Sequence, residues 1–315
     1  MNTDQILISG INALKNKNFN EAEKNFKLLL KSQPGHPEGN HFLGITFQLL
    51  NKIDEAIECY KKTIKIKPEF AEAYNNLGNI LYRLGKIDEA QPYFKKAVEI
   101  KPNFTEASTI LDIILEQKKV LSKIQNTKNI IKNKKKPGIR LSSNPFITMR
   151  EVEKELTSTL YKLKYIKLDK TKDIRYGNGK CSPDLKLFDS DLSIIKNLKE
   201  DLTNIMKQSV ESEIYVVESF FNILSTDSGT TPHRHIDPFD KTYGIIDQKY
   251  SLVYYLSVGD QNCSDPGILT LYDPNDEILP TKGSIVIIPA NRKHSAVYNG
   301  KTDRVMIGVN FYSLL

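Results

Sequence analysis

Cysteine is scarce in this chain of 315 residues. The three cysteines, Cys59, Cys181 and Cys263, lie far apart, and none belongs to a CxxC pair. A disulfide framework needs a larger, even set of cysteines, and a zinc knuckle needs closely spaced pairs. Both are excluded, and the three residues are expected to be free thiols, as in proteins of a reducing compartment.

Long apolar segments are missing as well. No run approaches the ~18 consecutive apolar residues that a membrane span requires. The opening residues, MNTDQILISGINALKNKN, lack the basic start, the apolar stretch and the cleavage site of a secretory signal. We therefore expect a cytoplasmic protein with no membrane partner.

The net charge of +7 is confined to one segment. Nine basic residues and no acidic ones lie in residues 117–140, so the rest of the chain has 36 basic residues against 38 acidic ones. Such a distribution does not favour nucleic-acid binding. It predicts a solvated basic linker helix or, alternatively, a contact for an anionic partner.

A period of 34 residues runs through the first hundred residues. It is kept over three cycles by four sets, namely Gly10, Gly44 and Gly78; Ala22, Ala56 and Ala90; Phe26, Tyr60 and Phe94; and Pro34, Pro68 and Pro102. The small residues would let two successive helices approach closely, the aromatic ring would fill the gap, and proline would end each unit.

These repeats resemble the tetratricopeptide repeat (TPR) over about residues 3–102. The resemblance implies an all-α solenoid in residues 1–116, with three repeats and the start of a capping helix, followed by the basic helical linker of residues 117–140. Solenoids of this kind bind an extended peptide or another protein in a groove, or serve as scaffolds and oligomerisation modules.

The second half of the chain has a different texture. Residues 148–164 and 190–209 are expected to form amphipathic helices. From residue 213 the segments IYVVESFFNIL, YSLVYYLSV, GILTLYD, GSIVIIPA and RVMIGVNFY are rich in β-branched and aromatic residues and are separated by turn residues. They predict a sandwich or jelly roll, and the whole chain is expected to be an α+β multidomain protein.

Candidate metal ligands lie in this β-rich part. Residues i and i+2 of a strand project to one face, so His235 and Asp237 are expected to present an imidazole and a carboxylate to one point. His294 follows a predicted strand and would complete a set that leaves positions open on iron(II). His233 has the same spacing from His235, so a pair of these two histidines is the alternative.

Other polar residues are candidates for binding a co-substrate. Arg304 lies ten residues after His294, and its guanidinium could hold a carboxylate with two parallel hydrogen bonds. One hydrogen-bonding group could come from the strand residues Tyr254, which is preferred, Tyr255, Tyr272 and Asn222. Residues 175–180 lack phosphate-loop spacing and are predicted to form a turn or a lid over the substrate entrance.

Residues 210–315 resemble the 2-oxoglutarate and Fe(II)-dependent dioxygenases of the prolyl-hydroxylase-like type. The resemblance rests on the HxD pair, the distal histidine, the arginine ten residues later and the strands beside them. It implies a double-stranded β-helix, a form of jelly roll, with flanking helices in a domain of residues 141–315.

The same resemblance implies the cofactors and the reaction. Iron(II) would be bound by His235, Asp237 and His294, and 2-oxoglutarate by Arg304 with Tyr254, while O2 would take the last open position. The reaction would hydroxylate a substrate and release succinate and carbon dioxide.

The two halves together suggest a substrate. A side chain of a protein or peptide captured by the repeats is the leading target. The alternatives are a small-molecule hydroxylase that uses the repeats for assembly into an oligomer, a cupin-type jelly roll with another activity, and a non-catalytic peptide-binding adaptor.

Overall fold

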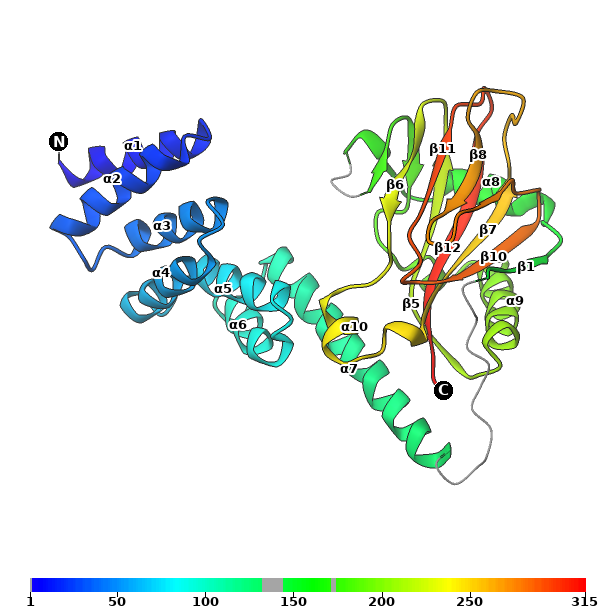
Figure 1. The fold of residues 1–315 in the computed structure, drawn as a ribbon, viewed down its shortest axis with the longest axis horizontal. Coiled ribbons are helices and arrows are strands. Elements are labelled where there is room, and N and C mark those ends of the chain that lie inside the picture. The colour runs from blue at the N-terminus through cyan, green and yellow to red at the C-terminus, as the bar shows by residue number, and fades with distance from the viewer. Residues whose placement is uncertain (1, 132–143, 171–173) are drawn as a thin grey trace. The chain divides into compact units, whose positions relative to one another are not determined.

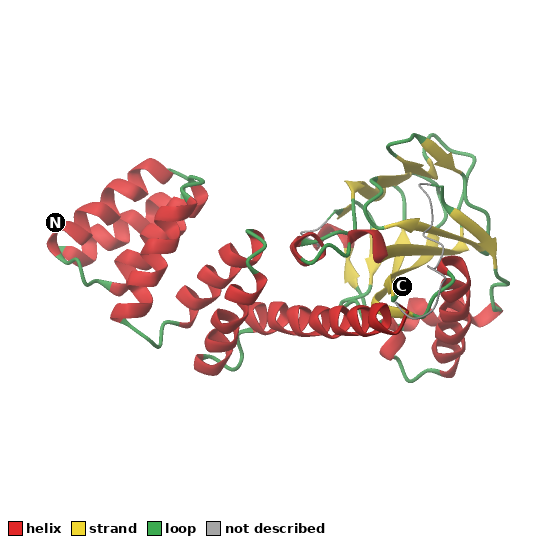
Figure 2. Cartoon of the chain, turned by 60° about the horizontal axis from the view of Figure 1, so that its bottom comes forward, coloured by secondary structure: helices red, strands yellow, loops and turns green. Residues whose placement is uncertain are grey.

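The computed structural model describes residues 2–131, 144–170 and 174–315, and the chain forms two compact units, Met1–Glu116 and Gln117–Leu315. Figure 2 shows helices alone in the first unit and all of the strands in the second. Residues 132–140, the end of the predicted basic linker, lie outside the described residues. In the described part, no helix is long and apolar enough to cross a membrane.

The first unit is a series of helices in which chain neighbours pack together (Figure 1). They are α1 (Thr3–Lys15), α2 (Phe19–Ser32), α3 (Pro37–Leu49), α4 (Ile53–Ile66), α5 (Ala71–Arg83), α6 (Ile87–Ile100) and the first part of α7 (Thr105–Ile131). Because α7 is continuous, the expected capping helix and the start of the basic linker form one helix.

The repeated glycines set how closely the helices of a pair approach. A Cβ atom on Gly10 would lie 2.5 Å from Phe26 Cε1, and one on Gly44 would lie 2.7 Å from Tyr60 Cε1. Both aromatic rings are fully buried. The spacing of 34 residues therefore reflects one packing contact that recurs in each helix pair, since a larger residue would collide with the ring.

The second unit contains twelve described strands. The longer ones are β5 (Ile214–Leu224), β6 (Ser228–His233), β7 (Lys249–Ser257), β8 (Pro266–Leu271), β10 (Ser284–Pro289), β11 (His294–Tyr298) and β12 (Arg304–Ser313). The shorter ones are β1 (Phe146–Met149), β2 (Ile166–Lys167), β3 (Arg175–Tyr176), β4 (Gly179–Cys181) and β9 (Asp276–Ile278).

These strands form two antiparallel sheets. One has seven strands in the order β1-β10-β7-β12-β5-β4-β2, and the other has five in the order β3-β6-β11-β8-β9. From β5 onward, most consecutive strands lie in different sheets, as Figure 1 shows. Residues far apart in the sequence are therefore brought to the space between the sheets.

Alternation along the strands of the larger sheet separates its two faces. One face packs against α8 (Lys154–Lys162) and α9 (Ser193–Val210) and forms the main apolar core. That core includes Leu156, Ile195, Leu198, Leu202, Phe221, Leu252, Tyr254, Ile285, Ile307 and Val309. The opposite face is turned toward the smaller sheet.

The five segments predicted as strands coincide with β5, β7, β8, β10 and β12, and the helix predicted for residues 190–209 is α9. The helix predicted for residues 148–164 is shorter than expected, because α8 begins at Lys154. Residues Phe146–Met149 pair with β10 as an edge strand instead.

Candidate metal centre

A cavity of about 240 Å³ lies between the two sheets. Because β5, β12 and β7 are paired in register, its wall on the larger sheet consists of three cross-strand rows. The rows are Glu218–Asn310–Ser251, Phe220–Gly308–Val253 and Asn222–Met306–Tyr255. On the other side the lining includes Arg175, Thr230, His233, Leu269, His294 and Ala296.

Three imidazoles meet at one end of this cavity. His233 ends β6 and is paired in register with His294, which begins β11. His235 follows in the loop, where its backbone N–H donates to the carbonyl of Ala290 at 2.8 Å. The three histidines offer ring nitrogens within 4.8 Å of one another, which makes them the only such group of His, Cys, Asp or Glu among the described residues.

The hydrogen bonds of His233 and His294 orient these two rings for metal binding. Nδ1 of His233 lies 2.7 Å from the carbonyl oxygen of Thr231, and Nδ1 of His294 lies 3.1 Å from that of Arg292. A carbonyl only accepts, so both Nδ1 atoms are protonated and both Nε2 atoms carry the lone pair that a metal needs. Nδ1 of His235 lies 3.3 Å from the side-chain amide of Asn310.

The electrostatic surroundings keep the rings of His235 and His294 uncharged. Burial, together with the neighbouring His233, lowers the pKa of His294 to about 4. Burial also lowers the pKa of His235 well below its usual value, and the neighbouring His294, His233 and Lys249 add to the effect. At neutral pH the imidazoles of His235 and His294 are therefore in the form that binds metals.

The spacing of the nitrogens fits a shared metal ion. Nε2 of His235 lies 3.2 Å from Nε2 of His294. Two nitrogens that each bind one ion at about 2.1 Å and close to a right angle lie about 3 Å apart. The residues present therefore suit a metal of the class that imidazole binds, which includes iron and zinc.

Asp237, the predicted carboxylate ligand, is not part of this group. Strand β6 ends at His233, so the alternation of side chains does not extend to residue 237. Asp237 instead caps α10 (Pro238–Thr242), where its Oδ1 accepts from the backbone N–H of Asp240. The structure therefore gathers His233 with His235 and His294, which corrects the preferred ligand set.

The other oxygen of Asp237 belongs to a buried cluster of charges. Lys249 Nζ lies 3.1 Å from Asp237 Oδ2 and 2.8 Å from Asp240 Oδ2. Gln117 of α7 also donates to Asp237 Oδ2 at 2.7 Å, and the hydroxyl of Tyr312 donates to Asp240. Burial raises the pKa of Asp240. Burial by itself would lower the pKa of Lys249, but the carboxylates of Asp237 and Asp240 raise it.

Arg304 is also placed differently from the prediction. It begins β12 with no exposed surface, and its guanidinium donates to the carbonyls of Val258 at 3.3 Å, Pro266 at 2.9 Å and Gly267. It does not line the cavity. Its side chain ties the start of β12 to β8 and to the end of β7 instead of facing a ligand.

Tyr254 lies on the opposite face of β7 from the cavity. Its hydroxyl donates to the carbonyl of Glu151 at 3.0 Å and accepts from Arg150 at 3.1 Å. Because neighbouring strand residues point to opposite faces, Tyr255 lines the cavity in its place. The choice between the two tyrosines required knowledge of which face of β7 the helices cover.

Sequence reasoning missed Glu218, Asn310 and the position of Arg175. The first two belong to period-2 patterns on β5 and β12, in which Asn310 is in phase with Met306 and Gly308. This shared phase could have identified Asn310 as a cavity residue from the sequence. Arg175 lies on a strand of two residues, β3, and so short an element has no periodicity to detect.

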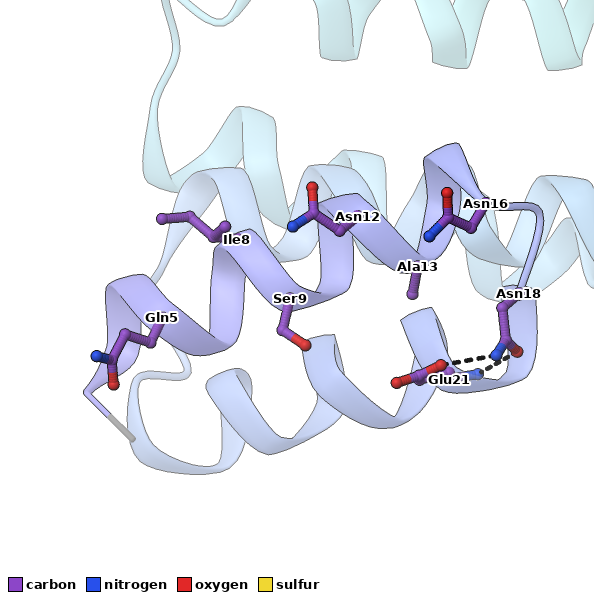
Figure 3. A pocket seen from close by; sticks show the side chains of 8 residues that line it. All are labelled: Gln5, Ile8, Ser9, Asn12, Ala13, Asn16, Asn18 and Glu21. Carbon is purple, nitrogen blue, oxygen red and sulfur yellow. Dashed lines mark hydrogen bonds between the residues drawn. The ribbon is translucent and has the colours of Figure 1, made fainter.

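The first unit also has a polar groove, shown in Figure 3. It has a volume of about 610 Å³ and is lined by Gln5, Ile8, Ser9, Asn12, Ala13, Asn16, Asn18 and Glu21. Half of these side chains are amides. An amide can both donate to and accept from an extended peptide backbone.

Comparisons with known proteins locate the repeats. The family described as TPR repeat matches residues 46–85, and the family described as tetratricopeptide repeat matches residues 71–104. The first unit thus contains TPR repeats, as predicted. A search of curated proteins finds no match to the chain.

Several solved structures are similar to part of the chain. An O-GlcNAc transferase of Thermobaculum terrenum is 21% identical over 36% of this chain and 22% of its own, with a TM-score of 0.34. The first TPR of Spaghetti, bound to an HSP90 peptide, is 20% identical over 36% of this chain and 90% of its own, with a TM-score of 0.35. The TPR2B domain of yeast Sti1, in a complex with pHsp70, is 16% identical over 36% and 97%, with a TM-score of 0.34. The chain thus spans less than a quarter of the transferase, whereas it spans nearly all of the two TPR domains.

Proposed function

We propose that the second unit is a 2-oxoglutarate- and Fe(II)-dependent dioxygenase that hydroxylates a side chain of a protein or peptide bound by the TPR unit. The observation that carries the proposal is the convergence of His233, His235 and His294 in a cavity between two sheets. Three imidazoles would occupy one side of a metal ion and leave its other positions for ligands.

The strand order supports the proposal. The central strands follow the orders β10-β7-β12-β5 and β6-β11-β8-β9, and this exchange of strands between two sheets supports a double-stranded β-helix. His233 at the end of β6 and His294 at the start of β11 meet on neighbouring strands. The two histidines are 61 residues apart in the sequence, so the proposed ligands come from two separate strands.

The bound iron and the residues of the cavity would have different roles in the reaction. Bound iron would supply the redox chemistry that couples O2 to a 2-oxo acid. The chain would hold the imidazoles through Thr231, Arg292 and Asn310. The apolar side chains of the wall, among them Phe220 and Val253, would exclude water from the reacting groups.

The TPR repeats give the reason for a peptide substrate. The TPR domains of Spaghetti and Sti1 were solved with an HSP90 peptide and with pHsp70. In this chain the amide-lined groove of α1 and α2 would bind an extended segment in a similar manner. The alternative, a peptide-binding adaptor, is favoured by one finding, namely that both matching families cover the repeats alone.

Anaerobic calorimetry with Fe(II) followed by a succinate assay tests the enzymatic proposal. The full chain should bind about one equivalent of Fe(II) and release succinate from 2-oxoglutarate in air with a pool of synthetic peptides, and His294→Ala should lose both. His36→Asn, which keeps a side-chain cap on α3, is the control and should retain both. Absence of iron binding and of succinate would favour the adaptor.

A change in the groove tests the choice of substrate. The double variant Asn12→Ala, Asn16→Ala should raise KM for peptides that the unmodified chain hydroxylates and leave iron binding unchanged. Unchanged KM for every such peptide would remove the role of this groove in substrate capture.

A further inference from the structure

One row of the cavity wall is rich in hydrogen-bond acceptors. Glu218 on β5, Asn310 on β12 and Ser251 on β7 are paired across the strands, and all three residues line the cavity. The row lies at the end of the cavity where the imidazoles meet, since Asn310 Nδ2 lies 3.3 Å from Nδ1 of His235. A ligand bound against this row would therefore lie beside the proposed metal centre.

Glu218 supplies a carboxylate that has no cationic partner. It is the only acidic residue among the described residues that line the cavity. Its Oε2 accepts from Nδ2 of Asn310, and in the described part of the chain it forms no ion pair. Lys249, at the start of β7, is already paired with Asp237 and Asp240. Because a partly buried charge without a partner is costly, this end of the cavity favours a cationic ligand.

Asn310 leaves an acceptor unused in the same row. The residue is only 2% exposed, and its amide nitrogen contacts both Glu218 and His235. Its Oδ1 is buried and has no hydrogen-bond partner among the described residues. The hydroxyl of Ser251, which is also 2% exposed, adds a third acceptor. A ligand that brings several N–H donors would satisfy groups that the protein leaves unpaired.

We propose that Glu218 binds the primary ammonium group of a lysine side chain in the protein or peptide substrate, and that Asn310 and Ser251 accept its other hydrogen bonds. An ammonium group has three donors and no acceptor, which matches a row of three acceptors. The assignment rests on the proposed function and names its substrate class. It makes Glu218 the residue that selects a cationic side chain over an apolar one of the same length.

The carboxylate of Glu218 favours an ammonium group over a guanidinium group. An arginine binds a carboxylate best through two parallel hydrogen bonds, one to each oxygen. Oε2 of Glu218 already accepts from Asn310, which leaves Oε1 for a ligand. A compact point charge can use this single oxygen, whereas the planar fork of an arginine would have to compete with Asn310.

The neighbouring row of the wall suits the methylene groups of a lysine. Phe220, Gly308 and Val253 lie two residues away from the acceptor row on the same three strands, and none has a polar side chain. A Cβ atom on Gly308 would lie 2.3 Å from Phe220 Cζ, so the ring occupies the space that a larger residue would need. Apolar contact along the stem and an ionic contact at the tip fit the amphipathic side chain of lysine.

Ligand-observed NMR titration of the full chain, with and without Zn(II), tests the assignment with two probes. Zn(II) is a diamagnetic ion of the class that imidazole binds. The first probe is lysine blocked as its Nα-acetyl methylamide. The second is norleucine blocked in the same way, which has the same carbon chain without the ammonium group. The unmodified chain should bind the lysine probe on the order of 10- to 100-fold more tightly, as expected for charge-assisted hydrogen bonds.

Variants of Glu218 make the result specific. Glu218→Gln removes the charge but keeps an oxygen that can accept from Asn310, so it should abolish most of the preference for lysine and leave the affinity for norleucine and for Fe(II) unchanged. Glu218→Asp, which keeps the charge on a shorter side chain, should retain part of the preference. Glu200→Gln removes an equal charge from the exposed surface of α9 and should have no effect.

The outcomes separate this proposal from the dioxygenase proposal. Equal affinity of the unmodified chain for the two probes overturns the assignment, and this result needs no variant. An unchanged preference in Glu218→Gln also overturns it, as does tighter binding of arginine blocked in the same way. Iron binding and succinate release would stand in each case. Conversely, a lysine preference that Glu218→Gln abolishes, in a chain that binds no Fe(II), supports the ammonium site and overturns the dioxygenase.

Discussion

The two units of the chain differ in the sequence separation of their decisive contacts. In the TPR unit, Gly10 packs against Phe26, 16 residues later, and the same contact recurs in the next repeats. In the sheet unit, His235 meets His294 across 59 residues, and Arg175 meets Asn222 across 47. Short, repeated separations leave a periodic pattern in the sequence, whereas long ones depend on which strands pair.

The largest expected effect is on the free energy of unfolding, and it is found by comparing a buried ion pair of the sheet unit with an exposed one of the TPR unit. Lys249→Met should lower the free energy of unfolding by about 3–5 kcal/mol, since it leaves Asp237 and the fully buried Asp240 without their cation. Lys52→Met breaks a pair with Glu23 on the surface and should cost less than about 1 kcal/mol. Urea denaturation of the two variants measures the difference. A similar cost for both would mean that burial does not distinguish the pairs.

The next effect concerns the ligand set. His233→Ala should weaken Fe(II) binding by more than about 100-fold, which is at least the penalty seen for groups that merely orient ligands. Asp237→Asn should change it less than about tenfold, because Asp237 contacts Lys249 and Gln117 and not the metal position. Anaerobic metal titration checks both. The reverse order of effects would restore the set that was expected from the sequence.

A smaller effect tests the repeat contact. Gly10→Ala and Gly44→Ala should each destabilise the chain by about 1–3 kcal/mol, because the added methyl group meets a buried ring. Gly35→Ala is the matched control, since nothing lies within 4 Å of its Cβ position, and it should be neutral or slightly stabilising. Thermal unfolding followed by helix ellipticity gives the comparison. Equal behaviour of all three variants would contradict close helix packing.

The smallest effect is a pH dependence in the TPR unit. Burial lowers the pKa of His41 to about 4, although Glu72 and Glu38 oppose the shift. The unfolded chain takes up the proton below about pH 6.5 and the folded chain does so only near 4, so stability falls as pH falls through this window. Between pH 7 and 5.5 His41 should account for a loss of about 1 kcal/mol, and His41→Leu should remove this share while the shares of His235 and His294 remain. An unchanged slope in this variant would assign the effect to other groups.

The fold was predictable wherever local chemistry repeats. The helix pairs followed from glycine, alanine, aromatic and proline positions, and the long strands of the second unit from their composition. The short strands β1 to β4 and β9 were not predictable, because segments of two to four residues take their conformation from a neighbouring strand and not from their own sequence.

The candidate site was predictable only in part, and the errors have a common cause. His235 and His294 were identified, but Asp237, Tyr254 and Arg304 were assigned to the cavity by assuming that each strand continues or faces inward. Strand β6 stops at His233, and β7 turns Tyr254 toward the helices.

The sequence by itself determined that the chain joins TPR repeats to a β-rich region containing paired histidines. The tertiary structure decided which side chains share the cavity, because two sheets that exchange consecutive strands bring together residues with no common spacing. In the structure, His233 lies beside the other two imidazoles, Arg304 donates to backbone carbonyls, and Arg175 lies in the wall of the cavity. The direction of a side chain depends on where its strand begins and ends and on the register in which it pairs. Packing of the folded chain decides these features.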